Sequence, residues 1–461
     1  MNKQQLLLKE RFSEKIKFSK EYLNKYGRDW YQGLTPSPIA IFFPENEEDV
    51  IDLIDFASKN KLKIVISGGR TGLNGGATAT DGEIVLSTEK LNKIQWNEEN
   101  NEVICQPGVI TDNAKKFVEE KGRFLPIEFS STSSSSIGGN VATNAAGAKF
   151  IKYGSTKNHV TGINIILPSG KKIQLSKRSL KDATGPNLME IFYGSEGVLG
   201  LITLVTLKTH PMMDFKETVL IKVNNLNSVQ SKLINKKNEL ISSLEFWDKN
   251  CHALTGGEVD SDYVILLELV SQEKKEIENF LENISEKFGD SVSLLNSKQA
   301  IEMWSARENI PVLLSDMNAY KLDICVPLKS LQKYLEDINA LNLGVKIYSF
   351  GHLGDGNVHI NLVGDEKINE SKNKIYEVTK MHSGSPSAEH GIGQRKKYIW
   401  TTFSDYSDKH ELLKTLKKSI DPENIMGPKV FFCPFPHRFR NISLLDTPSE
   451  LEIKRKRAPE G

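Results

Sequence analysis

Short apolar runs alternate with amphipathic segments along the first half of the chain. Residues 36–69 predict a strand, then a helix with an acidic start at Glu45, Glu47 and Glu48, and then a buried strand that ends in glycines. Further elements are predicted as strands over 82–88, 101–108 and 200–211, a helix over 111–121, a loop over 130–147, and a hairpin over 162–175. This half is expected to form an α/β unit that closes near Pro211.

The second half has strands and charged helices in turn. Strands are predicted over 218–223, 263–270, 320–327 and 345–350, and helices over 228–242, 273–288, 329–341, 367–382 and 408–420. A further helix is expected to start near Arg307. This repetition predicts an α+β domain with an antiparallel sheet. Residues 434–461 lack periodicity and end in a basic cluster, so we expect a poorly ordered tail.

Composition narrows the possible classes of function. At 461 residues the chain is too long for one core, so two or three domains are expected. A net charge of +1 gives no electrostatic argument for nucleic acid. The four cysteines form no CxxC pair, which argues against an iron–sulfur cluster, a zinc ribbon and a disulfide framework. The sequence has no secretory or membrane-spanning apolar run, so a cytoplasmic protein is expected.

Three glycine-dense segments, 67–77, 130–155 and 192–203, lie in the first half. Successive glycines let backbone N–H groups point into one concavity that suits phosphate oxygens, although a plain glycine turn explains the first segment equally well. The second segment could be a linker, but it lies between strands and contains Val141, so burial is expected. Three such loops in one half indicate a long ligand with several parts.

Two histidines bracket a turn in the second half. The stretch FGHLGDGNVHIN places Gly354–Asn357 between His352 and His359, and this turn should reverse the chain so that both imidazoles can converge. Asn361 shares a face with His359. Two histidines across a turn are more often structural or exposed than metal ligands, and a metal site usually needs a third ligand.

The segment SAEHGIG offers that third ligand. It places Glu389 next to His390 in another glycine-punctuated loop. A helix-capping turn with a solvated glutamate is the alternative interpretation. The residues alone leave both interpretations open.

The blocks SGGRTGLNGGA, IGGNVATNAAGAKFIKYG and FYGSEGVLGLITLVTLK resemble the FAD-binding domain of the vanillyl-alcohol-oxidase/para-cresol-methylhydroxylase (PCMH) superfamily. The resemblance runs from about Tyr26 to Phe432 and is greatest to the D-2-hydroxyacid dehydrogenase branch, which includes D-lactate and D-2-hydroxyglutarate dehydrogenases and the glycolate oxidase flavoprotein subunit. That branch has GHLGDGNxH and SAEHGIG as paired hallmarks, and both are present.

The resemblance implies an α+β fold with a two-subdomain, PCMH-type FAD-binding domain and an α+β cap domain with an antiparallel sheet. The expected divisions are a helical lead-in at 1–34, the FAD-binding domain at 35–212, the cap at 213–420 and a segment at 421–433 that returns to the FAD domain.

The resemblance also implies bound FAD. Covalent members carry His or Cys where this chain has Arg70 and Thr71, so non-covalent FAD is expected. A departure is Gly427, where the family usually has Asn before Pro. The residues implied in FAD binding are Gly68, Gly69, Arg70, Thr71, Gly72, Leu73, Asn74, Gly75, Gly76, Ser136, Gly138, Asn140, Thr143, Asn144, Gly147, Gly154, Glu196, Gly197 and Ile202.

The activity implied by the resemblance is metal-assisted oxidation of a small D-2-hydroxy acid to the 2-oxo acid. The residues His352, His359 and Glu389 would bind a divalent metal, zinc with manganese or iron as alternatives, and His390 would be the catalytic base. Such a ligand set leaves coordination positions open for substrate oxygens. Hydride would pass to flavin N5.

Substrate binding is expected to involve Arg307, Lys321, Asn361 and His390. The planar guanidinium of Arg307 suits a carboxylate, although surface charge is the ordinary explanation of any Arg or Lys. Pro311 stands where D-2-hydroxyglutarate dehydrogenases carry Thr, and the missing hydroxyl favours a D-lactate-like substrate.

The expected electron acceptor is left open among an electron-transferring flavoprotein, a cytochrome, a quinone and an iron–sulfur subunit. The alternatives are an oxidase that reduces O2, an ether-lipid-type synthase that uses FAD to replace a group on its substrate, and a flavoprotein subunit of a multi-subunit complex. No nucleic acid or transmembrane segment is expected, and a homodimer is a further expectation.

Overall fold

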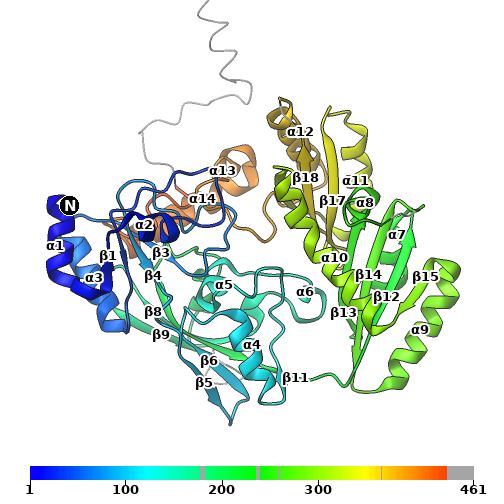
Figure 1. Ribbon diagram of the computed structural model, residues 1–461, viewed down its shortest axis with the longest axis horizontal. Coiled ribbons are helices and arrows are strands. Elements are labelled where there is room, and N and C mark those ends of the chain that lie inside the picture. Colours follow the sequence, from blue (N-terminus) through cyan, green and yellow to red (C-terminus); the bar gives the residue numbers. More distant parts are fainter. Residues whose placement is uncertain (177–180, 182, 235–238, 258–259, 365, 433–461) are drawn as a thin grey trace, which may run out of the picture.

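The computed structural model describes residues 1–176, 181, 183–234, 239–257, 260–364 and 366–432, so the predicted tail at 434–461 lies outside the described residues. The described chain has two halves (Figure 1). The N-terminal half holds two main sheets, and the C-terminal half is built on one large antiparallel sheet. The predicted α+β class, with two subdomains in the first half, is confirmed.

The first sheet mixes parallel and antiparallel strands. Its order is β1 (Ile16–Lys17), β2 (Ala40–Phe42), β4 (Ile84–Ser87) and β3 (Ile64–Ser67), and α1 (Lys3–Phe12), α2 (Lys20–Tyr26) and α3 (Glu47–Lys59) pack beside it. The helix α3 begins where the acidic run predicts, because Asn46 caps it by accepting the N–H of Asp49. It buries Leu53 and Ile54 in the core of this subdomain.

The second sheet is antiparallel throughout. Its order is β5 (Ile94–Asn97), β6 (Glu102–Cys105), β10 (Leu201–Lys208), β8 (Val160–Ile166) and β9 (Lys172–Ser176), accompanied by α4 (Thr111–Glu119), α5 (Ile137–Thr143), α6 (Phe150–Tyr153) and the pair β7 (Arg123–Phe124) and β11 (His210–Pro211). The prediction of a loop over 130–147 is wrong in part, since this segment contains α5. Ser136 caps this helix, and fully buried Ile137 and Val141 offset the low helix propensity of its glycines.

The C-terminal half is a seven-stranded antiparallel sheet. Its order is β15 (Val292–Leu295), β12 (Phe215–Val223), β14 (Tyr263–Ser271), β13 (Ile241–Asp248), β17 (Lys346–His352), β18 (Asn357–Val363) and β16 (Tyr320–Cys325); its helices are α7 (Leu226–Val229), α8 (Lys249–Leu254), α9 (Lys274–Phe288), α10 (Ser297–Asp316), α11 (Leu331–Ala340) and α12 (Ile368–Met381). On β16 and β18, Leu322, Ile324 and Ile360 face the core beneath α11 and α12. The alternate residues of these strands face the opposite side, where the chemistry lies.

Two predictions for this half are corrected. The helix over 228–242 is wrong in its later part, because β13 begins at Ile241. This strand is buried along nearly its whole length, so it lacks the alternation that marks a half-exposed strand. Arg307 lies inside α10 rather than at a helix start, since Asn296 caps that helix and Pro311 is accommodated within it.

The last part of the described chain returns to the N-terminal half. The helices α13 (Ile399–Thr402) and α14 (Ser407–Ile420), orange in Figure 1, lie against that half. The segment after α14 then runs parallel to β3, where the N–H of Ile64 donates to the Ile425 carbonyl at 2.8 Å. A buried ion pair between Lys417 and Asp421, 2.6 Å apart, spans the last turn of α14. None of the described helices is both long and apolar enough to span a bilayer.

Candidate active site

One large cavity, about 1550 Å³ in volume, lies between the two halves. The glycine-rich loops form one wall, and the polar face of the C-terminal sheet forms another. Of the residues predicted to bind FAD, all but Gly75, Asn144 and Gly154 line it. A cavity of this size at a domain interface, lined on one side by glycine-rich loops, suits a long ligand that carries phosphates.

The three exceptions have local structural roles. Asn144 ends α5 in the left-handed conformation, with φ of 51°. Gly154 ends α6 with φ of 79°, and a Cβ there would lie 2.4 Å from Asn158 Oδ1. Gly75 also has a positive φ and packs against Leu34. Their presence in the glycine-rich segments is explained by backbone geometry without a ligand.

The strands β17 and β18 form a hairpin around the Gly-Asp-Gly-Asn turn. In its register, His352 is opposite Asn357 and His359 is opposite Phe350. Side chains of paired residues lie on the same face of a sheet, as do those two apart on one strand. The imidazoles of His352 and His359 therefore converge, and their ring centroids are 5.6 Å apart.

Glu389, in the loop after α12, completes a cluster with these histidines. His352 Nε2 lies 3.3 Å from Glu389 Oε1, and His359 Nε2 lies 4.0 Å from Oε2. The three ligand atoms all lie within 4.8 Å of one another. Glu389 Oε1 is buried and accepts no hydrogen bond from the described residues. Donor atoms around one zinc ion are roughly 3 to 4 Å apart, so this cluster fits a divalent cation.

A buried carboxylate lies behind each imidazole. On β13, Glu245 Oε1 is 2.6 Å from His352 Nδ1, and on β16, Asp323 Oδ1 is 3.6 Å from His359 Nδ1. Each carboxylate is 1% exposed. Metal-binding histidines commonly donate their second ring N–H to a carboxylate, which fixes the tautomer. Here that arrangement directs both Nε2 atoms towards Glu389.

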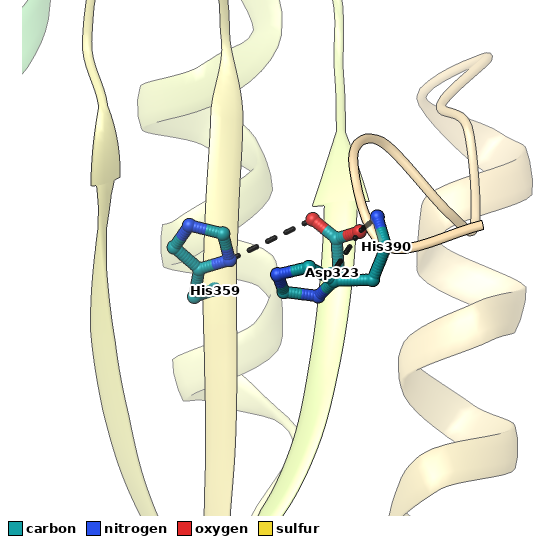
Figure 2. A group of neighbouring side chains, drawn as sticks. All are labelled: Asp323, His359 and His390. Atoms are coloured by element: carbon teal, nitrogen blue, oxygen red, sulfur yellow. Dashed lines mark hydrogen bonds and ion pairs between the residues drawn. The ribbon is translucent and has the colours of Figure 1, made fainter. Parts of the chain in front are cut away.

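Asp323 also holds the loop that carries His390, as Figure 2 shows. Its Oδ2 accepts the N–H groups of Glu389 and His390, each at 2.9 Å, and lies 3.4 Å from His390 Nδ1. Its Oδ1 accepts an N–H of the Asn357 amide at 3.0 Å. Asp323, His359 and His390 also have metal-compatible spacing. Since backbone and amide donors already occupy both of its oxygens, we interpret Asp323 as an orienting carboxylate and not as a metal ligand.

Electrostatics keep both carboxylates ionised. Burial would raise the pKa of Asp323, but attraction to His390 and Lys396 outweighs burial and holds that pKa far below its usual range. Burial would likewise raise the pKa of Glu245. That pKa is nevertheless lowered, chiefly by attraction to His352. Each carboxylate is therefore an anion at neutral pH that can accept an imidazole N–H.

Asn74 and Glu196 line the cavity and also bind the His390 loop. Asn74 Nδ2 donates to the carbonyl oxygens of His390 and Gly391 at 2.7 and 2.9 Å. Glu196 Oε1 accepts the N–H of Ile392 at 2.8 Å. Burial raises the pKa of Glu196 to about 7, although this N–H opposes the rise. The loop of His390 is therefore attached directly to two of the glycine-rich segments.

Asn74→Ala is expected to lower kcat by roughly 10- to 100-fold per bound flavin. It removes two hydrogen bonds from the loop that carries His390, and a displacement of about 1 Å at a reacting group costs on the order of 10²-fold. Steady-state kinetics normalised to flavin absorbance measure the effect. Asn92→Ala, an exposed asparagine in the same half, is the matched control. A wild-type kcat in Asn74→Ala would contradict the positioning role.

Arg307 reaches the cavity from α10. Its Nη2 lies 2.6 Å from Glu245 Oε2, and its guanidinium lies over the ring of Phe350 at 4.7 Å. Its Nε is buried and donates no hydrogen bond to any described residue. The guanidinium is thus fixed in place at the cavity wall, where its charge suits a carboxylate.

Lys321 and Asn361 share the cavity wall on neighbouring strands. Lys321 Nζ donates to the Pro311 carbonyl at 2.9 Å and also to the Ser315 hydroxyl. Burial lowers the pKa of Lys321, and repulsion from the positive charge of Arg395 lowers it further. Asn361 is almost fully buried and donates to the His359 carbonyl at 3.1 Å. Lys321 therefore offers charge to the cavity, whereas the Nδ2 group of Asn361 already donates to the backbone.

Several residues of this site are not predicted from the sequence. Asp323 shares a face with Lys321 within an otherwise apolar strand, and this alternation is a usable signal. Glu245 gives no such signal, because its strand is buried on both faces. Lys25, Arg28 and Trp30 line the cavity from the lead-in, and nothing in their pattern marks them.

Both halves of the chain match families of known proteins. The family described as "FAD binding domain" matches residues 38–176, and the family described as "FAD linked oxidases, C-terminal domain" matches residues 213–430. A D-2-hydroxyglutarate dehydrogenase of Stutzerimonas stutzeri is 33% identical over 447 residues, which cover 91% of this chain and 96% of that protein. The mitochondrial D-2-hydroxyglutarate dehydrogenase of Arabidopsis thaliana is 31% identical and covers 89% of this chain and 78% of that protein.

Solved structures with the same fold have much lower identity. A 4-ethylphenol oxidase from Gulosibacter chungangensis superposes with a TM-score of 0.74 at 14% identity, covering 95% of this chain and 99% of that one. An alkyldihydroxyacetonephosphate synthase superposes with a TM-score of 0.73 at 16% identity, covering 93% and 85%. At such identities these likenesses concern the fold alone.

Proposed function

Since the chain belongs to the D-2-hydroxyacid dehydrogenase branch of the FAD-linked oxidases, in the vanillyl-alcohol-oxidase/PCMH superfamily, we propose that a divalent metal assists its reaction. Family membership makes it an FAD-dependent oxidoreductase that acts on the CH–OH group of a D-2-hydroxy acid. The observation that carries the metal proposal is the convergence of His352, His359 and Glu389 beside His390 in the cavity that the glycine-rich loops line.

The residues present fit a bound cation. Two Nε2 atoms face Glu389, whose Oε1 lacks a hydrogen-bond donor among the described residues, and a carboxylate lies behind each imidazole. A divalent cation held there would supply Lewis acidity towards a substrate hydroxyl. We propose zinc, and imidazole and carboxylate donors also suit manganese and iron.

His390 is proposed to remove the hydroxyl proton of the substrate. Asp323 faces its Nδ1, so Nε2 is the nitrogen left to accept that proton. The nearly parallel stacking of His359 on His390, at 5.5 Å between centroids, restrains the ring. FAD, held without a covalent bond, would accept the hydride from C2 when bound. Arg307 would bind the carboxylate of the substrate.

A dicarboxylic substrate such as D-2-hydroxyglutarate is proposed, with D-lactate as the second candidate. The sequence favours D-lactate because Pro311 lacks a hydroxyl, but Ser315 lies one helical turn further along α10 and brings its hydroxyl to Lys321. This pair would bind a second carboxylate, separate from Arg307. The named activity of the relatives in Stutzerimonas and Arabidopsis supports the same choice.

A substrate screen under anaerobic conditions tests this function. The flavin absorbance should be bleached by D-2-hydroxyglutarate with a kcat/KM at least 10-fold above that for D-lactate, while the L-enantiomers leave it oxidised. Lys321→Met should lose roughly 10- to 100-fold in kcat/KM for the diacid and little for D-lactate, because a charge-assisted hydrogen bond contributes about 1.5 to 3 kcal/mol. Lys346→Met, an exposed lysine on β17, is the control. Faster bleaching by D-lactate would favour the second candidate.

The acceptor, location and assembly are also proposals. We propose an external electron acceptor, a cytoplasmic location and a homodimer. Hydrogen peroxide formed in stoichiometric yield under air would instead identify an oxidase. Flavin that no hydroxy acid reduces would favour the synthase or subunit alternatives.

A further inference from the structure

Glu245 has two partners that belong to different parts of the proposed chemistry. Its Oε1 lies 2.6 Å from His352 Nδ1, and its Oε2 lies 2.6 Å from Arg307 Nη2. The carboxylate is 1% exposed, so water does not compete for either oxygen. One anion therefore joins a proposed metal ligand to a proposed substrate ligand.

The fold makes this connection rigid. Glu245 is opposite His352 in the pairing of β13 with β17, so both side chains rise from the same face of the central sheet. Its neighbours Leu244 and Phe246 point into the core on the other face. The helix α10 packs on the cavity side through Ile310 and brings Arg307 over the carboxylate. Side chains held by a central strand vary less in position than those on loops.

Each partner needs the carboxylate for a different reason. With a cation bound, His352 Nδ1–H would donate to Glu245 and leave Nε2, which lies 3.3 Å from Glu389 Oε1, as the metal ligand. Arg307 directs one N–H group at Glu245, and its Nε–H has no acceptor among the described residues. The orientation of the guanidinium at the cavity wall depends on the bond to Glu245.

We propose that Glu245 is a positioning residue that holds the metal ligand His352 and the substrate-binding Arg307 at a fixed separation. This inference rests on the proposed function. The separation matters because a 2-hydroxy acid carries its hydroxyl and its carboxylate on neighbouring carbons, so the groups that receive them must be correctly spaced. Loss of Glu245 should therefore affect both metal affinity and substrate affinity, although Glu245 contacts neither ligand.

The test uses the FAD-loaded protein and the variant Glu245→Gln. An amide cannot accept from His352 and Arg307 with both of its ends, because one end is a donor. We expect the zinc Kd to rise by roughly 10- to 100-fold, the range for orienting carboxylates. At saturating zinc, the KM for D-2-hydroxyglutarate should rise several-fold more than kcat falls. Glu302→Gln, on the exposed side of α10, is the matched control.

A double-mutant cycle with Arg307→Met separates the two effects. In the Arg307→Met background, Glu245→Gln should still weaken zinc binding, but its effect on KM should disappear. Glu245→Asp keeps the charge and is too short to reach both partners, so it serves if Glu245→Gln does not fold. A zinc Kd and a KM within twofold of wild type in either variant would overturn the inference alone. A wild-type protein that binds no divalent metal would overturn the proposed function and this inference with it.

Discussion

Replacement of His390 by glutamine is expected to lower the rate of flavin reduction by roughly 10²- to 10⁴-fold, the contribution typical of a general base. Glutamine has nearly the reach of histidine but no basic nitrogen. The backbone N–H of residue 390 would still bond to Asp323, so the loop should stay in place. FAD content and zinc content should therefore equal those of the wild type, and the loss should fall on proton removal.

Anaerobic stopped-flow reduction by D-2-hydroxyglutarate measures this rate directly. His382→Gln is the matched control, because His382 pairs with Asp337 at 2.8 Å and does not line the cavity. Flavin reduction in His390→Gln within a few-fold of wild type would remove His390 from the role of base. Loss of FAD in the same variant would point to a structural role of the residue.

The sequence predicts the parts of this site that depend on local chemistry. The turn between His352 and His359 reverses the chain because Gly354–Asn357 has strong turn propensity, and the register of the hairpin then brings both imidazoles to one face. The glycine-rich segments likewise reach the cavity as predicted from their composition. In each case the information lies within one continuous segment of the sequence.

The parts that sequence reasoning missed depend on strand order. Glu245 and Asp323 lie far from the hairpin in sequence, and they meet its histidines because β13 and β16 flank β17 and β18 in the sheet. A single sequence gives the pleat of a strand but not its neighbours. The attachment of the His390 loop to Asn74 also depends on the tertiary fold, since the hydrogen bond joins residues 316 positions apart.

The strand order also determines which carboxylate orients which histidine. The inner pair of strands carries the two imidazoles, and each outer strand carries the carboxylate that orients one of them. Asp323 also accepts the backbone N–H of His390, the proposed base. Glu245 also accepts a hydrogen bond from Arg307. One four-strand face therefore positions the proposed metal ligands, the proposed base His390 and the proposed carboxylate anchor Arg307.

Removal of the proposed divalent cation is expected to lower kcat for D-2-hydroxyglutarate on the order of 10³-fold. Lewis-acid stabilisation of developing negative charge is worth several kcal/mol, and each 1.36 kcal/mol is a factor of ten in rate. Dialysis against a chelator, with metal analysis of the same sample, measures the loss. Zinc, manganese or iron added back one at a time should identify the ion by recovery of activity.

A variant without the ligand set distinguishes this effect from inhibition by the chelator itself. His359→Ala removes one Nε2 of the cluster and should show the same loss of kcat, with little zinc bound and with FAD retained, because His359 lies on the cap sheet and not in the glycine-rich loops. His382→Ala, with an imidazole outside the cavity, should keep both metal and activity. Undiminished flavin bleaching in His359→Ala and in the chelated wild type would mean that His390 and the flavin suffice, and that the three convergent ligands serve only to hold the sheet and the loop together.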